Sequence, residues 1–279
     1  MSVRTPAGLT GLFACLWLSM STGQAQAPDS FGNAPSYDIA VPAFSDAEIG
    51  RLLSALDAKL ALNRARASWS REAQSTLAEF GRRLQTERLS PAQERRVLAH
   101  LAAVAKTHPD STGLVEATRR TVRGFTLGKK APDIVAADLD GATFKLSEYR
   151  GKVVVIAFSA DWCGICKSEY PYYRLLLELY RDWPLAVLGV DGSTDVTAAR
   201  QIKSDQRLPY RSWWDGGGAT TKDGPIAKAW NVRGWPTTYV IDHEGIIRFV
   251  DLRRESLLGA VRQLLNEEHA ATVRAKIKK

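Results

Sequence analysis

Residues 153–158, VVVIAF, form a continuous apolar run that is separated by four residues from the first cysteine of a Cys-x-x-Cys pair. Such a run is typical of a strand that is buried on both faces of a sheet. The residues from Cys163 to about Tyr180 have helical spacing. The sequence therefore predicts a buried strand that leads through a short loop into a helix beginning at Cys163, and it favours folds in which helices cover a sheet.

From Gly128 onward, short apolar strands alternate with helical segments, which is the pattern of a sheet that contains βαβ units. The stretch DIVAADLDGATFKL is predicted to be a leading β-hairpin that turns at Asp140 and Gly141. Trp213 and Trp214 fall in a predicted glycine-rich loop. The other predicted elements are strands at residues 185–190, 237–241 and 246–250, and helices at 196–204, 226–230 and 255–265.

The residues before this region have the pattern of a small all-α module. Ser45 and Glu48 have the spacing of a capping box at the start of a helix, and so do Ser90 and Gln93. Two more helices are predicted at residues 70–84 and 114–122. The module could simply pack against the next domain, or it could present a docking surface for a partner.

The first 27 residues have the features of a signal peptide: a basic residue, Arg4, then the apolar stretch GLTGLFACLWLSM, then the small-residue region GQAQA. The apolar stretch is short for a membrane span, so cleavage near Ala25 or Ala27 is favoured over an uncleaved membrane tether. Residues 28–44 contain three prolines and show no periodicity, which predicts a linker. We expect an extracytoplasmic location, periplasmic or in the cell envelope.

Cysteine usage excludes a disulfide framework, because the 279 residues include only Cys15, Cys163 and Cys166. With 45% hydrophobic residues, the chain is long enough for one large core or two smaller ones without covalent staples. Cys15 lies in the predicted signal peptide, where an ordinary apolar role is favoured over lipidation. The mature protein is therefore expected to keep only the Cys-x-x-Cys pair.

The net charge of +8 is spread thinly along the chain, and its densest run is VRAKIKK in a predicted basic tail, residues 269–279. This tail could contact anionic lipid or a polyanion, although a solvated chain end is the favoured interpretation. The sequence contains no nucleic-acid-binding motif, so we predict no nucleic-acid partner.

The Cys163–Cys166 pair is open to several interpretations. At a helix N-terminus, unpaired N–H groups and the positive end of the helix dipole stabilise a thiolate, which favours a redox-active disulfide. A structural zinc needs four ligands, and the four histidines include no ligand-like pair. Copper held by both thiolates and His243 is a further possibility. A purely structural disulfide would close so short a loop that it would add little stability.

Two stretches, APDIVAADLDGATFKLSEYRGKVVVIAFSADWCGICKSEYP and NVRGWPTTYVIDHEGIIRFVD, resemble the extracytoplasmic thioredoxin-like proteins of the TlpA and ResA type, over roughly residues 128 to 267. The resemblance implies an α/β thioredoxin-like fold, with a central mixed sheet flanked by helices and a leading β-hairpin, preceded by the all-α module. The expected divisions are a signal peptide (1–27), a linker (28–44), a helical module (45–123), a thioredoxin-like domain (124–268) and the basic tail.

The resemblance also implies roles for particular residues. Cys163 would be the attacking nucleophile and Cys166 the resolving thiol. The bond between Trp235 and Pro236 would be the family's cis-proline turn, which offers backbone groups to a substrate, whereas the sequence alone also allows an ordinary trans proline at the start of an edge strand. Glu169 matches an acidic residue near the active site and could accept a proton from the resolving thiol, or it could be a solvated helix residue.

Three further positions affect these expectations. Ala157 replaces the buried aspartate of cytosolic thioredoxins, so proton transfer would fall to the glutamate or to water. Trp235 is bulkier than the residue usual before the cis-proline; with Trp162 it could narrow the substrate groove and contact the substrate, or it could be an ordinary packed aromatic side chain. The intervening pair, Gly164 and Ile165, does not allow the reduction potential to be ranked.

We predict an exported thiol:disulfide oxidoreductase that reduces disulfide-containing secreted proteins, with a membrane electron donor and no bound cofactor or metal. The family resemblance implies three candidate clients and does not choose among them: an apocytochrome c, in cytochrome c biogenesis, another secreted protein, or a cysteine in a metal-site assembly factor. A peroxidase is disfavoured, because Ile156 and Ala160 stand where its motif requires proline and threonine or serine. The alternative is a binding module that holds copper or a client protein at the dithiol while the helical segment recruits a partner.

Overall fold

The computed structural model describes residues 43–61, 71–216 and 224–277. The predicted signal peptide and almost all of the predicted linker lie outside these residues, so both stay predictions. The helices that precede the sheet are α1 (Asp46–Ala61), α2 (Arg71–Arg83), α3 (Pro91–Thr107), the short 3-10 helix η1 (Pro109–Ser111) and α4 (Thr112–Gly124).

Local capping interactions start two of these helices. The backbone N–H of Ser45 donates to the Glu48 carboxylate at 2.9 Å, and the N–H of Glu48 donates to the Ser45 hydroxyl at 3.2 Å. Ser90 and Gln93 form the same reciprocal pair at α3. These boxes satisfy N–H groups that have no partner within the helix, and both match the sequence prediction.

The apolar faces of the four helices enclose one core, which includes Ile49, Leu56, Leu77, Val97, Leu101 and Val115.

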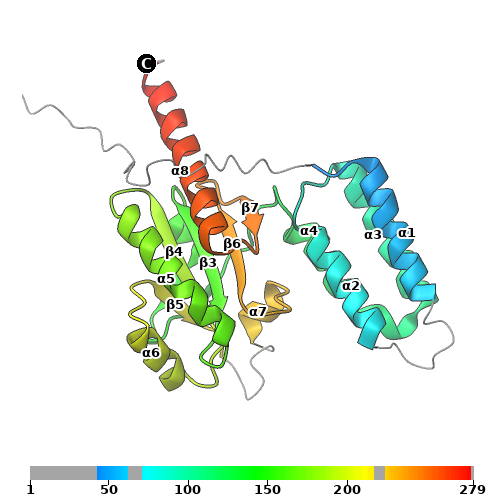
Figure 1. Ribbon diagram of the computed structural model, residues 1–279, viewed down its shortest axis with the longest axis horizontal. Helices are drawn as coiled ribbons and strands as arrows, with labels where there is room; N and C mark the ends of the chain where they lie inside the picture. Colours follow the sequence, from blue (N-terminus) through cyan, green and yellow to red (C-terminus); the bar gives the residue numbers. More distant parts are fainter. Residues whose placement is uncertain (1–42, 62–70, 217–223, 278–279) are drawn as a thin grey trace, which may run out of the picture. The chain divides into compact units, whose positions relative to one another are not determined.

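The remaining chain forms a five-stranded mixed sheet and a separate two-stranded hairpin. The elements are β1 (Val135–Ala137), β2 (Thr143–Lys145), the 3-10 helix η2 (Leu146–Tyr149), β3 (Val153–Ser159), α5 (Gly164–Leu179), β4 (Leu185–Asp191), α6 (Val196–Asp205), β5 (Arg211–Trp214), α7 (Pro225–Ala229), β6 (Thr237–Ile241), β7 (Ile247–Val250) and α8 (Arg254–Ile277). The strand order is β5-β4-β3-β6-β7, in which β3 runs parallel to β4 and antiparallel to β6 (Figure 1). This is the predicted thioredoxin-like arrangement.

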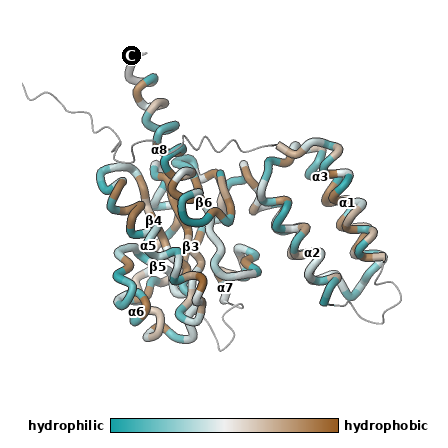
Figure 2. Tube along the Cα trace, in the orientation of Figure 1, coloured by the Kyte–Doolittle hydropathy of each residue, from teal (hydrophilic) through white to brown (hydrophobic). Residues whose placement is uncertain are grey.

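Strand β3 is buried along its whole length because both faces of the sheet are covered. Val153, Val155 and Ala157 pack in one core with residues of α5, α6 and α8. Val154 and Ile156 pack in a second core with the leading hairpin and α7. Hydropathy colouring shows apolar segments along the central strands (Figure 2). The dithiol follows directly from this doubly covered strand.

One sequence prediction was wrong at Trp213 and Trp214, which form strand β5 and not part of a loop. Val190 pairs with Trp213, and Asp191 pairs with Trp214, in a parallel register. Trp213 is fully buried and stacks on Phe144 of the hairpin, with ring centroids 4.2 Å apart and an interplanar angle of 2°. The strand has only four residues and precedes a glycine run, so its local pattern is weak, and long-range pairing decides its conformation.

The last helix is also longer than predicted. We expected it to end at Leu265, before a basic tail, but α8 continues to Ile277. Apolar periodicity stops at Leu265, and residues 266–275 include no buried side chain. The extension, NEEHAATVRAKI, is rich in good helix formers and has no glycine or proline to end the helix, so backbone propensity carries it past the core. Within the described part of the chain, no helix combines the length and the apolar character needed to cross a membrane.

Candidate active site

The two cysteines lie where β3 passes into α5. Cys163 has an extended backbone (φ −86°, ψ 93°) and is the N-cap residue, so the helix begins one residue later than predicted. Its sulfur accepts a hydrogen bond from the backbone N–H of Cys166 at 3.2 Å. The two sulfurs form a disulfide of 1.99 Å, with Cα atoms 5.3 Å apart. The structure therefore describes the oxidised form, with one sulfur at the positive end of a helix.

The disulfide is largely covered by its surroundings. Cys163 is 6% exposed and Cys166 is 1% exposed. Next to them, Trp162 and Ile165 are the exposed apolar side chains, at 44% and 68%. Cys163 is the more accessible of the two cysteines, which suits it to attack an incoming disulfide. Cys166 is more deeply buried, which suits it to attack the sulfur of Cys163 afterwards.

Trp235 is brought against Trp162 from a distant part of the sequence. The two rings meet edge to face, with centroids 5.9 Å apart. The indole N–H of Trp162 donates to the carbonyl of Gly192 at 3.2 Å. A Cβ atom on Gly192 would lie 2.6 Å from the ring of Trp235, so only glycine fits there. The sequence analysis missed Gly192, because nothing near it in the sequence indicates the approach of a tryptophan.

The peptide bond between Trp235 and Pro236 is cis, as the family resemblance implies. Thr237, the next residue, pairs with Phe158 at the end of β3, so the proline lies at the same end of the sheet as the cysteines. The guanidinium of Arg253 donates to the carbonyl of Pro236 and to the Thr238 hydroxyl. Sequence reasoning also missed Arg253, which braces the cis-proline turn from the segment between β7 and α8.

Glu169 lies one turn after Cys166 on α5 and is 2% exposed, so it is not a solvated helix residue. Its carboxylate accepts a hydrogen bond from the backbone N–H of Arg254 at 3.1 Å. The Arg254 side chain is 3.7 Å from the other carboxylate oxygen. Glu169 therefore lies against the start of α8. Its basic partner there is Arg254, whose side chain is more than half exposed.

A second buried carboxylate, Asp191, lies at the end of β4. Burial raises the pKa of its carboxyl above the usual 3.8, and the nearby charge of Asp161 acts in the same direction. The N–H of Ser193 donates to Asp191, and the hydroxyl of Ser193 accepts from the N–H of Asp161. These bonds tie the loop before Cys163 to the neighbouring strand. The sequence analysis did not single out any of these three residues.

Asp215 anchors the segment that leads to the cis-proline turn. Its carboxylate accepts hydrogen bonds from the N–H groups of Ile226 and Ala227, at the start of α7. Burial raises the pKa of this carboxyl to about 6, against the opposing effect of the two hydrogen bonds. The carboxyl group therefore fixes α7 at the end of the sheet that carries the active site.

The copper site considered from the sequence does not assemble. His243 lies in the turn between β6 and β7, whereas Pro236 and the dithiol lie at the other end of β6. In the ranges 43–61, 71–216 and 224–277, no group of three His, Cys, Asp or Glu side chains is placed to hold a metal ion.

Comparisons with known proteins match the part of the chain that carries this site. The AhpC/TSA family matches residues 127–250, which include the hairpin, the dithiol and the cis-proline turn. The thioredoxin-like protein YneN of Bacillus subtilis is 31% identical over 130 residues, which cover 45% of this chain and 71% of YneN. The chain belongs to the ResA/TlpA-type thioredoxin-like family.

Within this family, the thiol-disulfide oxidoreductase ResA of Bacillus thuringiensis subsp. konkukian is 31% identical over 121 residues. The match covers 43% of this chain and 65% of that protein, so the chain spans just under two thirds of the length of this relative. Among solved structures, the thioredoxin domain of a thiol-disulfide oxidoreductase from Bacteroides vulgatus is 21% identical, with a TM-score of 0.46. The match covers 51% of this chain and 99% of the Bacteroides chain.

Proposed function

We propose that this chain is an exported thiol:disulfide oxidoreductase that reduces disulfides of secreted proteins. The observation that carries the proposal is the Cys163–Cys166 disulfide at the N-terminus of α5, at the same end of the sheet as the cis bond before Pro236. A nucleophilic thiol needs the positive helix end, and a substrate strand needs free backbone groups beside it. Membership of the ResA/TlpA-type family supports the same activity and an extracytoplasmic location.

The reaction begins with the reduced protein. The Cys163 thiolate attacks one sulfur of a client disulfide, forms a mixed disulfide and releases the other client sulfur as a thiolate, which takes a proton. Cys166 then loses its proton and attacks the Cys163 sulfur, which releases the second client thiol and forms the protein disulfide. Two electrons pass from the protein to the client. A donor with a dithiol of its own, proposed to lie at the membrane, must reduce the protein again.

Within this scheme, we assign proton acceptance from Cys166 to Glu169. The carboxylate is buried one helical turn away, on the same helix as the thiol. We expect Glu169→Gln to slow release of the client from the mixed disulfide about 100-fold, as for loss of a general base. Rapid quenching and mass measurement follow this step. Glu178→Gln, an exposed change on the same helix, is the control. Unchanged release in Glu169→Gln would mean that water takes the proton.

Peroxidase chemistry is not favoured, although the AhpC/TSA family matches this region. Peroxidases of that kind carry a proline and a threonine or serine ahead of the reactive cysteine, where this chain has Ile156 and Ala160, both fully buried. These apolar side chains offer no hydroxyl group to a peroxide.

The reduction potential of the mature protein tests the proposal. The protein is equilibrated with glutathione and dithiothreitol buffers, and the two thiols are trapped and counted by mass. We expect a value near or below that of thioredoxin, about −270 mV. A value near that of the oxidant DsbA, about −120 mV, would overturn the reductant assignment in favour of disulfide formation. Failure to form the disulfide would overturn the redox function itself.

A further inference from the structure

We propose that Arg82 and Arg233 form an anion-binding site beside the cis-proline turn that receives an acidic side chain of the client protein. The inference rests on the proposed function and names the chemistry of the client. Arg82 lies on α2, Arg120 lies on α4, and Arg233 precedes the turn at Pro236. The helices α1–α4 and the sheet belong to one compact unit.

Arg233 is the central member of the site. One of its terminal nitrogens, Nη2, donates to the Thr118 hydroxyl at 3.2 Å. The other, Nη1, is buried and has no hydrogen-bond partner among the described residues. A Cβ atom on Gly81 would already lie 3.8 Å from Nη1, so a larger side chain on α2 would fill the space beside it. A buried donor without a partner is costly, so this nitrogen is available for an acceptor that the structure does not contain.

The charges that act on the pKa of Arg233 come from two other arginines. Burial lowers the pKa of its guanidinium below the usual value, and the charges of Arg120 and Arg82 lower it further. Among the described residues, none of these three arginines forms an ion pair with a carboxylate. An anion placed among them would relieve the repulsion between the guanidinium groups and accept a hydrogen bond from the unpaired Nη1 of Arg233.

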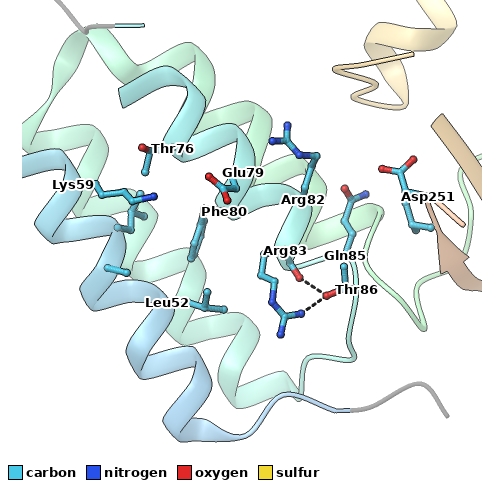
Figure 3. A pocket seen from close by; sticks show the side chains of 13 residues that line it. Leu52, Lys59, Thr76, Glu79, Phe80, Arg82, Arg83, Gln85, Thr86 and Asp251 are labelled. Carbon is cyan, nitrogen blue, oxygen red and sulfur yellow. Dashed lines mark hydrogen bonds between the residues drawn. The ribbon is translucent and has the colours of Figure 1, made fainter. Parts of the chain in front are cut away.

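A cavity of about 170 Å³ is present at this place. Its lining includes Ala78, Arg82, Asn231, Arg233, Trp235 and Pro236. At roughly 30 Å³ of liquid volume per water, the space matches about six waters, enough for one carboxylate side chain. Asp251, the carboxylate in the lining, is engaged by Arg253 at 3.3 Å. Figure 3 shows a neighbouring pocket that shares Arg82 on α2, Gln85 just after α2, and Asp251 with this cavity.

The position of the cavity favours a client side chain over a free anion. Trp235 lines the cavity and also meets the ring of Trp162, which directly precedes Cys163. A client whose disulfide reaches Cys163 therefore brings neighbouring residues to the cis-proline turn. Arginine donors match the two oxygens of a carboxylate, so aspartate or glutamate close to the reactive cysteine is the side chain that fits.

Two peptide disulfides test this inference. They are identical except that glutamates flank the cysteine in one and glutamines in the other. The second-order rate of their reduction by the reduced full chain is followed by mass. We expect the glutamate peptide to react about tenfold faster, the size of one charge-assisted hydrogen bond. Arg82→Gln and Arg233→Gln should each bring the ratio of the two rates close to one.

The control is Arg123→Gln, which removes an exposed charge on α4 and should leave the ratio unchanged. If it lowers the ratio as much as Arg82→Gln does, the preference is a general charge effect and the inference is overturned. If both peptides are reduced at equal rates, the anion-binding inference is overturned but the reductase function stands. If neither peptide is reduced, the reductase function itself is overturned. If inorganic phosphate binds in the cavity while the peptides react equally, the site belongs to a free anion. Arg82 is exposed, so its variant tests the site even where Arg233→Gln fails to fold.

Discussion

Replacing Cys163 by serine is expected to abolish the reduction of protein disulfides, with a loss of at least about 1,000-fold. A serine hydroxyl is not ionised near neutral pH and does not attack a disulfide. The remaining thiol of the pair cannot take over, because Cys166 is almost fully buried. Turnover of a disulfide-linked substrate, with reductant supplied in excess, measures the loss.

Cys166→Ser should behave differently, because the attacking thiol remains. The first step then proceeds, but nothing displaces the client, so a mixed disulfide between Cys163 and the client should accumulate. Mass spectrometry of the acid-quenched protein detects this adduct. If Cys163→Ser accumulates the adduct and Cys166→Ser does not, the roles of the two thiols are the reverse of those proposed here.

The largest stability loss is expected for Trp213→Ala, about 3–5 kcal/mol of unfolding free energy. Trp213 is fully buried, stacks on Phe144 and donates its indole N–H to the Phe144 carbonyl at 3.2 Å. The Arg211 guanidinium lies 4.0 Å from the centroid of the same phenylalanine ring. Removing the indole therefore leaves a cavity between β5 and the leading hairpin. Urea denaturation followed by circular dichroism gives the free energy.

Trp214→Ala is the matched control for that experiment. Trp214 is the adjacent residue on β5 but is only half-buried, so its loss should cost much less, about 1 kcal/mol. Similar small losses for both tryptophans would contradict the strand and restore the glycine-rich loop that the sequence predicts. A large loss for Trp213 alone supports the pairing of β5 with β4.

Short-range patterns account for the parts of the protein that were predicted correctly. The capping boxes at Ser45 and Ser90 depend on residues three apart, and the hairpin turn depends on Asp140 and Gly141. The buried strand before Cys163 is visible because an apolar run reflects cover on both faces. The family resemblance supplied the cis-proline at Pro236, which local reasoning would have left as an ordinary proline.

The sequence alone determined the buried strand β3, the spacing of the dithiol and, to within one residue, the start of the helix that follows Cys163, because each depends on neighbours along the chain. Only the tertiary structure decided which distant groups surround the dithiol. Gly192 and Arg253 meet the cis-proline turn, and Arg233 meets two helices from the first half of the chain. Such contacts leave no periodic mark in the sequence, because they arise from strand order and side-chain packing between segments that lie far apart.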